Sequence, residues 1–222
     1  MVIDQPHDLH WRDGVPVSNR FDDPFYSLQD GLAEARHVFL GGNDLPGRFR
    51  DGFHVAELGF GTGLNFAATA LAWRQAGVRG RLHFTSFEAF PMAVEDLRQA
   101  LDQFPEAAPI APMIEAALAG RACVNDVGIT LSVVVGDARQ TVPAWDGRAD
   151  AWFLDGFAPA RNPELWEEAL LHAVADHTAL GGTCATYSAA GAVRRALDAA
   201  GFAVERRPGF GRKRHMTAGR LR

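Results

Sequence analysis

The sequence lacks the marks of a metal-binding, disulfide-bonded, secreted or membrane-spanning protein. Its 222 residues include only two cysteines, Cys123 and Cys184, which stand far apart without a pairing pattern, as is typical of a reducing compartment. The eight histidines are scattered without metal-ligand spacing, so we expect no metal. No apolar run approaches the roughly 20 residues that span a bilayer, and residues 1–10 carry no secretion signal. We therefore expect a cytoplasmic protein with no membrane partner.

Lysine is almost absent, and Lys213 is the only one in the sequence. The formal net charge of −5 argues against a protein that coats nucleic acid over its whole surface. Residues 206–222 nevertheless hold seven Lys or Arg and no Asp or Glu. Such a basic end can dock a phosphate backbone, although composition alone favours a solvated tail.

Runs typical of strands alternate with runs typical of helices from residue 51 onward. We expect strands at 53–58, 81–88, 129–135, 149–155, 181–188, 202–207 and 214–219, and helices at 64–75, 91–103, 163–178 and 189–200. This alternation implies βαβ units in an α/β, doubly wound, mainly parallel seven-stranded sheet that ends in an antiparallel strand.

The chain reads as one structural domain. Residues 51–222 would form it, with a helical excursion at 104–128. Residues 1–50 would be an irregular N-terminal extension packed on the core, with one helix at 27–40.

The stretch ELGFGTGLNF, residues 57–66, places three glycines between a predicted strand and a predicted helix. Glycine lets the backbone approach a ligand closely, and the next helix offers free N–H groups. The G-x-G-x-G spacing of Gly59, Gly61 and Gly63 differs from the G-x-G-x-x-G that binds dinucleotides. Glu57 would disfavour a pyrophosphate but suits the positive amine and sulfonium of S-adenosylmethionine. The loop therefore predicts an S-adenosylmethionine site.

Two more acidic residues follow the next predicted strands. Glu88 ends the 81–88 strand, from which a carboxylate can accept hydrogen bonds from both ribose hydroxyls. Asp137 follows the 129–135 strand and can accept from an adenine amino group. Each alone could be a solvated strand end. Three acids after three successive strands, with a glycine loop at the first, favour S-adenosylmethionine over NAD.

Asp155 ends the fourth apolar strand and is followed by the constrained turn Gly156-Phe157-Ala158-Pro159. An alkyl ammonium must lose a proton before its nitrogen can accept a methyl group, and a nearby carboxylate can take that proton. Phe157 could form a wall of the slot. The alternative is that Asp155 only caps the turn or the next helix, but its place beside the predicted cofactor favours the catalytic role.

Tyr26 and Tyr187 lie near the predicted site loops. Both could be ordinary half-buried aromatic residues, and both are candidates for substrate contact.

Several segments together resemble the methyltransferase domain of the MnmC family, which also occurs as the stand-alone enzyme MnmD. They run in order over nearly the whole chain, from about residue 18 to residue 216: SNRFDDPFYS, VFLGGN, ELGFGTGLNF, FLDGFAPARNPELW, AAGAVRRALDAAGF and GFGRKR. DGFAPARNPELW and GFGRKR are far more particular to that family than the glycine loop is.

The resemblance implies a class I methyltransferase fold and a tRNA substrate. Such enzymes methylate the 5-aminomethyl group of 2-thiouridine at the tRNA wobble position, giving the 5-methylaminomethyl form. Asp155 would serve the amine, and the candidate cofactor-binding residues are Glu57, Gly59, Phe60, Gly61, Thr62, Gly63, Asn65, Glu88, Asp137 and Ala138. The candidate substrate-binding residues are Tyr26, Phe157, Pro159, Tyr187, Arg212, Lys213 and Arg214. The partner would be the tRNA anticodon loop, whose unpaired wobble base is extruded at little cost.

The sequence departs from the family pattern at two positions. Ala89 stands where the family usually has lysine, and His215 stands where an acid is common. In MnmC the domain is fused to a flavin-dependent oxidase, for which no second glycine motif and no length remain here. We therefore expect a stand-alone form or an excised domain, with any oxidase as a separate or fused partner.

Two other functions stay open at this stage. One is an N-methyltransferase of the same fold acting on a small-molecule amine. The other is a non-catalytic nucleotide-binding module, in which the glycine loop is only a tight junction between strand and helix.

Overall fold

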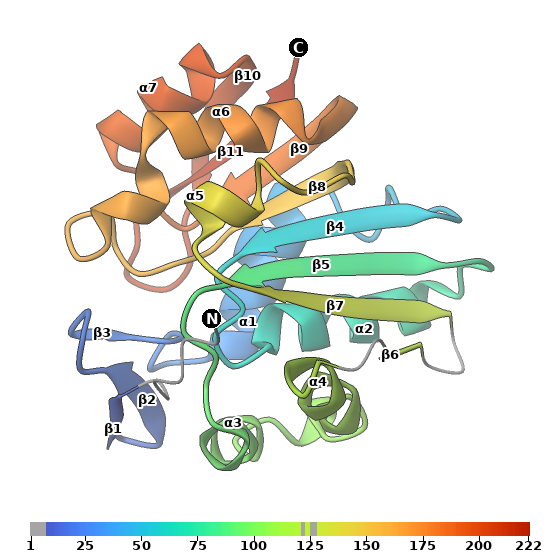
Figure 1. The fold of residues 1–222 in the computed structure, drawn as a ribbon, viewed down its shortest axis with the longest axis vertical. Helices are drawn as coiled ribbons and strands as arrows, with labels where there is room; N and C mark the ends of the chain where they lie inside the picture. Colours follow the sequence, from blue (N-terminus) through green and yellow to red (C-terminus); the bar gives the residue numbers. More distant parts are fainter. Residues whose placement is uncertain (1–7, 121–122, 125–127) are drawn as a thin grey trace.

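A central eight-stranded sheet organises the chain. The computed structural model describes residues 8–120, 123–124 and 128–222 (Figure 1). The strand order is β10-β11-β9-β8-β4-β5-β7-β6. These strands are β4 (Phe53–Leu58), β5 (Leu82–Glu88), β6 (Cys123–Val124), β7 (Ile129–Val135), β8 (Ala149–Leu154), β9 (Thr178–Thr186), β10 (Phe202–Pro208) and β11 (His215–Leu221).

The pairing of the strands confirms the predicted doubly wound, mainly parallel α/β class. β7, β5, β4, β8 and β9 pair with their neighbours in parallel. β11 runs antiparallel between β9 and β10, so the chain ends in the expected antiparallel pair. The sheet has one strand more than the seven expected, because the two residues of β6 pair antiparallel with β7 at the edge. A strand of two residues has no alternation that a sequence pattern could reveal.

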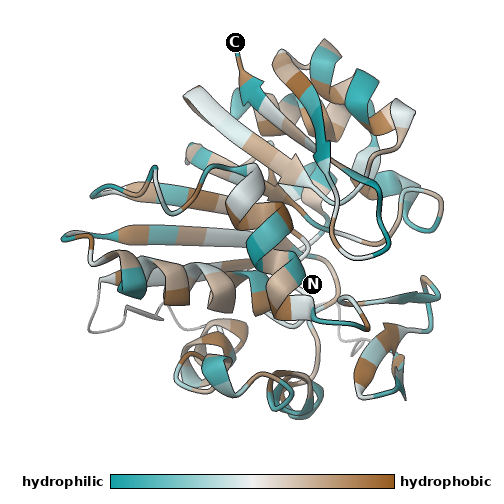
Figure 2. Ribbon diagram, turned by 180° about the vertical axis from the view of Figure 1, so that it is seen from behind, coloured by the Kyte–Doolittle hydropathy of each residue, from teal (hydrophilic) through white to brown (hydrophobic). Residues whose placement is uncertain are grey.

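Helices cover both faces of the sheet (Figures 1 and 2). One layer contains α1 (Gly31–Ala35), α2 (Leu64–Ala76), α3 (Val94–Leu101) and α4 (Ala111–Leu118), and the other contains α5 (Ala138–Thr141), α6 (Glu168–Asp176) and α7 (Gly191–Ala199). Neighbouring residues of β8 point into opposite layers: Phe153 packs in the first, and Trp152 and Leu154 pack in the second. Burial on both faces explains why the strands read as continuous apolar runs.

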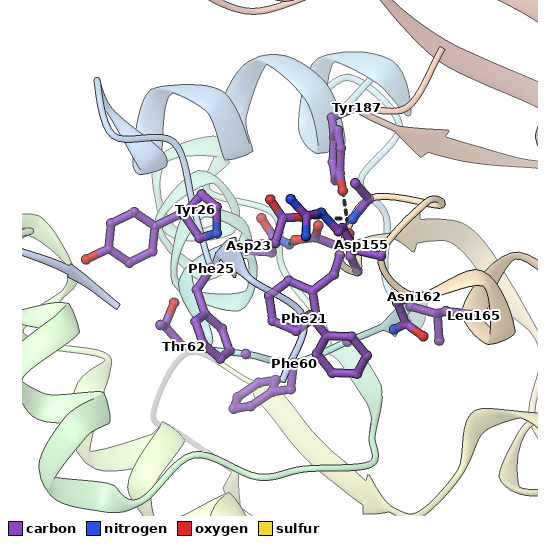
Figure 3. Close-up of a pocket in the computed structure, with 18 of the residues that line it drawn as sticks. Phe21, Asp23, Phe25, Tyr26, Phe60, Thr62, Asp155, Asn162, Leu165 and Tyr187 are labelled. Carbon is purple, nitrogen blue, oxygen red and sulfur yellow. Dashed lines mark hydrogen bonds between the residues drawn. The ribbon is translucent and has the colours of Figure 1, made fainter. Parts of the chain in front are cut away.

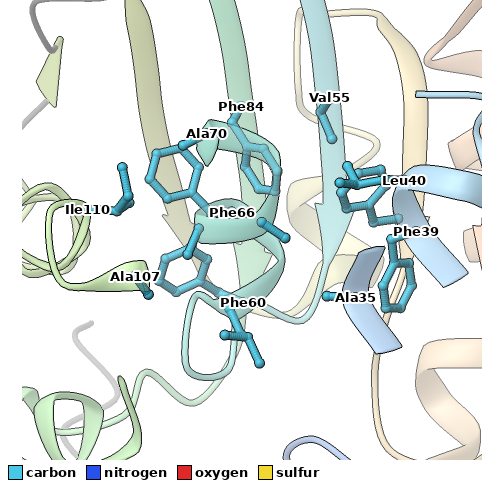
Figure 4. Packing of buried hydrophobic residues seen from close by; sticks show 14 of the residues in the cluster. Ala35, Phe39, Leu40, Val55, Phe60, Phe66, Ala70, Phe84, Ala107 and Ile110 are labelled. Carbon is cyan, nitrogen blue, oxygen red and sulfur yellow. The ribbon is translucent and has the colours of Figure 1, made fainter. Parts of the chain in front are cut away.

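Phenylalanine rings contact one another among the aliphatic side chains of the first layer (Figure 4). Phe66 of α2 meets Phe84 of β5 edge-on at 5.2 Å between ring centroids, and Phe84 in turn meets Phe153 at 5.9 Å. Phe39 lies 5.4 Å from Phe153 on the other side. This core fixes α2 against the sheet, and therefore fixes the glycine loop from which α2 begins.

The N-terminal segment is more regular than the irregular extension expected for residues 1–50. Three short strands, β1 (Leu9–Arg12), β2 (Val15–Ser18) and β3 (Asp23–Pro24), form a small antiparallel sheet. All four residues of β2 are buried, so the segment shows no alternation of polar and apolar residues.

The helix expected at 27–40 is shorter and divided. It begins at Gly31, where Asp30 caps α1 by accepting a hydrogen bond from Ala33 N. It then continues as a π-helix, η1 (Arg36–Gly41). The cap formed by the Asp30 side chain therefore determines where the helix begins. The apolar spacing alone placed this beginning too early.

Other boundaries also moved. The helix expected at 163–178 opens as a 3₁₀ turn, η3 (Pro163–Trp166), before α6. The excursion at 104–128 contains η2 (Pro105–Ala107) and α4, and its residues 121–122 and 125–127 lie outside the described part. No helix in the described ranges is both long and apolar enough to cross a membrane.

Candidate active site

A cavity of about 950 Å³ opens at the carboxyl ends of β4, β5 and β8 (Figure 3). The glycine loop (residues 59–63), the turn after β8 (residues 155–165) and the N-terminal segment (residues 20–39) contribute to its wall, as do residues 87–90, 137–139, 187 and 210–213. Ligands of open α/β sheets bind at this edge. The volume is at the upper end of the roughly 300–1,000 Å³ typical of ligand sites, which leaves room for two ligands side by side.

Most residues predicted for the site line this cavity. They are Tyr26, Gly59, Phe60, Gly61, Thr62, Asn65, Glu88, Asp137, Ala138, Asp155, Phe157, Tyr187, Arg212 and Lys213. Four predicted residues are not in its lining: Glu57, Gly63, Pro159 and Arg214.

The three glycines of the loop all have positive φ, with values of 79°, 52° and 73° for Gly59, Gly61 and Gly63. A Cβ at Gly59 would collide with the backbone carbonyl of Asp155, and one at Gly61 would lie 3.2 Å from the Phe25 ring. The absence of a side chain at Gly59 is therefore needed for close contact with the turn after β8, apart from any contact with a ligand. This close approach brings the loop and Asp155 to the same wall of the cavity.

The amino end of α2 begins directly behind the loop. Gly63 is its N-cap and supplies no side-chain hydrogen bond to the first turn. Backbone N–H groups at such an end, together with the helix dipole, favour a negatively charged group. This end of the cavity fits a ligand carboxylate, such as that of S-adenosylmethionine.

Glu57 is fully buried beneath the loop and does not reach the cavity. Its Oε2 accepts a hydrogen bond from the Ser86 hydroxyl at 2.7 Å, and its Oε1 accepts one from Asn65 Nδ2 at 2.9 Å. Burial raises the pKa of Glu57 well above its ordinary value.

Glu88 and Asp137 line the cavity from the ends of β5 and β7. The Glu88 carboxylate accepts hydrogen bonds from the backbone N–H of Gly61 at 3.0 Å and of Phe90 at 2.8 Å, so it ties the glycine loop to β5. Asp137 caps α5 and pairs with the Arg139 guanidinium at 2.7 Å, which lowers the pKa of Asp137. Each oxygen of Glu88 accepts one of these bonds and has a second acceptor site, which leaves capacity for a ligand.

Asp155 lies in the cavity wall at the end of β8, and its Oδ2 accepts a hydrogen bond from Asn65 Nδ2 at 2.7 Å. Burial raises the pKa of Asp155 to about 7, although the hydrogen bond from Asn65 acts to lower it. The negative charge of Glu34 raises it further, and the positive charge of Lys213 lowers it. A carboxyl group with a pKa near neutrality can exchange a proton with a substrate.

Lys213 forms part of the cavity wall. Its Nζ lies 2.9 Å from Glu34 Oε1 and 3.9 Å from the centroid of the Tyr187 ring. The Tyr187 hydroxyl donates a 2.6 Å hydrogen bond to the carbonyl of Gly156, next to Asp155. Sequence reasoning missed Glu34, because an acidic residue in a short amphipathic helix reads as a solvated position.

The N-terminal segment covers the cavity with aromatic side chains. Phe21 stacks on Phe157 at 4.7 Å, and Phe25 meets Phe157 edge-on at 5.2 Å. Asp23 Oδ2 accepts a hydrogen bond from Ala158 N at 2.8 Å, which anchors the segment to the turn after β8. Sequence reasoning did not place Phe21, Asp23 or Phe25 in the site, although the RFDDPF motif that contains them was the available signal.

Tyr26 contributes its ring rather than its hydroxyl to the cavity. The hydroxyl points away from Phe25 and Phe21 in Figure 3, toward the carbonyls of Gly14 and Ala100 at 3.5 and 3.4 Å. The ring itself is buried.

In the described ranges, no group of His, Cys, Asp and Glu residues has the arrangement of a metal site.

Residues 93–222 match the model of a family described as S-adenosyl-L-methionine-dependent methyltransferase. The chain belongs to this methyltransferase family. Its members use S-adenosyl-L-methionine, so the predicted cofactor is confirmed and a non-catalytic module is no longer the interpretation. The match begins after the glycine loop, so it is independent of the G-x-G-x-G pattern.

Curated relatives of the methyltransferase carry the name tRNA 5-methylaminomethyl-2-thiouridine biosynthesis bifunctional protein MnmC. The relative from Marinobacter nauticus is 43% identical over 98% of this chain and 37% of its own length. The one from Caulobacter sp. (strain K31) is 47% identical over 93% of this chain and 37% of its own length. The chain therefore spans a little over a third of the relatives it matches, and the predicted resemblance to the MnmC methyltransferase domain is confirmed.

A solved structure shows the same architecture. The crystal structure of MNMC2 from Aquifex aeolicus aligns with a TM-score of 0.75 at 26% identity, over 94% of this chain and 67% of that chain.

Proposed function

We propose that the methyltransferase transfers a methyl group from S-adenosyl-L-methionine to the amine of 5-aminomethyl-2-thiouridine at the tRNA wobble position. The product would be 5-methylaminomethyl-2-thiouridine, the nucleoside named in the curated relatives. The observation that carries the proposal is Asp155, a carboxyl group with a pKa of about 7 in the wall of a cavity large enough for cofactor and acceptor.

The cofactor would lie along the glycine loop. The amino end of α2 would hold its carboxylate, Glu88 would accept from its ribose hydroxyls, and Asp137 would accept from its adenine amino group. When bound, S-adenosyl-L-methionine supplies an electrophilic methyl group on a positively charged sulfur. Ala138 and the loop residues Phe60 and Thr62 line the same part of the cavity.

Asp155 would prepare the acceptor amine. As a carboxylate it binds the substrate ammonium and takes one proton, which frees the nitrogen lone pair for the methyl group. Its pKa of about 7 lets it be ionised at neutral pH and still accept that proton. Holding the nitrogen in line with the methyl carbon would supply most of the rate enhancement.

The aromatic cover would hold the modified base. Phe21, Phe25 and Phe157 form a cluster over the cavity with centroid separations of 4.7 and 5.2 Å. Aromatic side chains bind splayed RNA bases by stacking, typically with about 1–3 kcal/mol per base. An unpaired wobble uridine can enter such a slot without the loss of a base pair.

The exposed arginines beside the cavity would contact the anticodon loop. Arg212 lines the rim and Arg214 follows on the same exposed turn, so both can reach phosphate oxygens. Such a substrate implies a cytoplasmic location. The relatives are named bifunctional, which fits a second enzyme, separate or fused. From the resemblance to MnmC, this second enzyme would be a flavin-dependent oxidase that supplies the 5-aminomethyl group.

A second candidate is methylation of a small-molecule amine. It is favoured by one observation: Lys213, the only lysine, pairs with Glu34 inside the rim and is thereby less available to a phosphate. A small amine would need only Asp155 and the cavity. It would be turned over without RNA, and reversing the charge of Arg212 and Arg214 would leave its rate unchanged.

The deciding experiment uses bulk tRNA from cells that lack the activity. The purified protein is incubated with this tRNA and S-adenosyl-L-methionine, and nucleosides are identified by mass spectrometry. We expect 5-aminomethyl-2-thiouridine to gain one methyl group, and the Asp155→Asn variant to give almost none. Full methylation by Asp155→Asn would overturn the role of Asp155, and an unchanged nucleoside with the parent protein would overturn the substrate.

A further inference from the structure

A single amide group links the buried carboxyl group of Glu57 to the Asp155 carboxyl group in the cavity wall. Asn65 Nδ2 lies 2.9 Å from Glu57 Oε1 and 2.7 Å from Asp155 Oδ2. An amide nitrogen has two hydrogens, so each is directed at one carboxyl oxygen. The two carboxyl oxygens also determine the orientation of the amide group, because they would repel the amide oxygen if it took the place of the nitrogen. Asn65 therefore has no amide hydrogen left for a cofactor.

The other end of this link is held inside the sheet. Glu57 on β4 lies opposite Ser86 on β5, and the Ser86 hydroxyl donates to Glu57 Oε2 at 2.7 Å. Glu57 is fully buried, and within the described ranges no cation pairs with it. Burying a carboxyl group in an apolar strand is unfavourable. Among the described residues, the hydrogen bond of its side chain toward the cavity is the one from Asn65.

We infer that Glu57 and Asn65 are positioning residues for Asp155, with Glu57 orienting the Asn65 amide and Asn65 fixing one carboxylate oxygen of Asp155. The inference rests on the proposed function for the use of Asp155 in methyl transfer. It replaces the direct cofactor contact expected of Glu57 and Asn65. The link has two effects: it holds the Asp155 carboxylate in one orientation, and its hydrogen bond favours the ionised form against burial.

The first test measures Asp155 itself, without any substrate. The ¹³C signal of its side-chain carboxyl group, assigned by its loss in Asp155→Asn, is titrated by NMR in the parent protein and in Asn65→Asp. Aspartate has the shape of asparagine but donates no hydrogen bond and adds a negative charge. The Asp155 pKa should rise in Asn65→Asp, and an unchanged pKa overturns the inference.

Thr69→Val is the matched control on the same helix. Thr69 is buried one turn beyond Asn65, and its hydroxyl donates to the Asn65 backbone carbonyl at 2.7 Å. The variant therefore disturbs α2 without touching the amide, and the Asp155 pKa should stay at the parent value. A rise equal to that of Asn65→Asp would mean that the shift only reports a general disturbance of α2, which also overturns the inference.

The second test compares two variants of Glu57. Glu57→Gln keeps an oxygen for the Asn65 amide and can still bond to Ser86, whereas Glu57→Met has similar length and no acceptor. Glu57→Met should raise the Asp155 pKa. It should also lower kcat by about tenfold or more, a fraction of what general acid–base catalysis contributes as a whole. Glu57→Gln should keep both the pKa and kcat near the parent values. S-adenosyl-L-methionine affinity, measured by calorimetry, should be unchanged in both.

The outcomes separate this inference from the proposed function. If Glu57→Met loses cofactor affinity while the Asp155 pKa stays at the parent value, Glu57 serves the cofactor and the inference is wrong. If the parent protein methylates no tRNA, the proposed function fails, but the NMR titrations still decide whether the link controls Asp155.

Discussion

The ammonium group of Lys213 lies 2.9 Å from Glu34 Oε1, in the wall of the cavity that Asp155 also lines. Glu34 is mostly buried, and the pair brings together residues 179 positions apart in the sequence. The two charges act on the Asp155 carboxyl group in opposite directions: Glu34 raises its pKa and Lys213 lowers it. After burial and the hydrogen bond from Asn65, the pair therefore adjusts the pH at which Asp155 becomes ionised.

Variants of this pair should move the pH dependence of methylation in opposite directions. The rate should fall on acidification through the pKa of Asp155, about 7 in the parent. Lys213→Met removes a positive charge, so the acid limb of kcat should move to higher pH. Glu34→Gln removes a negative charge, so the limb should move to lower pH.

The double variant and an arginine variant serve as controls. Lys213→Met combined with Glu34→Gln should return the acid limb toward the parent value, since both charges are gone. Arg212→Gln removes an exposed charge at the rim and should leave the limb in place while raising KM for tRNA. Identical limbs in all of these proteins would show that Asp155 is not the group that titrates.

Asp155 should also make the protein less stable at alkaline than at acidic pH. Its pKa is raised in the folded state from the ordinary value of 3.8 to about 7, so between these two values the folded protein binds more protons than the unfolded one. The free energy of unfolding then falls as pH rises through this window. Asp155→Asn removes the titration and should raise Tm relative to the parent at pH 8 but not at pH 4. An equal change at both pH values would contradict a raised pKa for Asp155.

The glycine loop gives a prediction about packing rather than charge. Gly59→Ala introduces a methyl group against the Asp155 carbonyl at a positive φ, and should lower both stability and cofactor affinity. Gly77→Ala is the matched control, because Gly77 also has positive φ but has no atom within 4 Å of the added Cβ. In Gly77→Ala, the free energy of unfolding should fall only by the roughly 1–2 kcal/mol that the left-handed backbone conformation costs alanine. Denaturant unfolding measures this loss. Equal losses for the two variants would mean that the contact with Asp155 is unimportant.

The sequence predicted the sheet because its central strands β4, β5 and β8 are six or seven residues long and buried on both faces, and because helices separate them. It could not predict β3, which has two residues, or the π-helix η1, whose residues also fit an ordinary helix. The acids at strand ends were identifiable because parallel strands end at one edge. The contact from Asn65 to Asp155 could not be identified from the sequence, since it joins residues 90 positions apart whose side-chain directions depend on packing.

Phe157 allows the acceptor side of the cavity to be tested apart from the cofactor side. Its ring stacks on Phe21 and meets Phe25 edge-on in the aromatic cluster over the cavity. Phe157→Leu keeps an apolar side chain but loses the flat face, so KM for tRNA should rise by about tenfold, the equivalent of one stacking contact at the low end of its range. Phe157→Tyr keeps the face and should stay near the parent. Calorimetry should give the same S-adenosyl-L-methionine affinity for all three proteins, and a loss of cofactor affinity in Phe157→Leu would place this ring on the cofactor instead of the base.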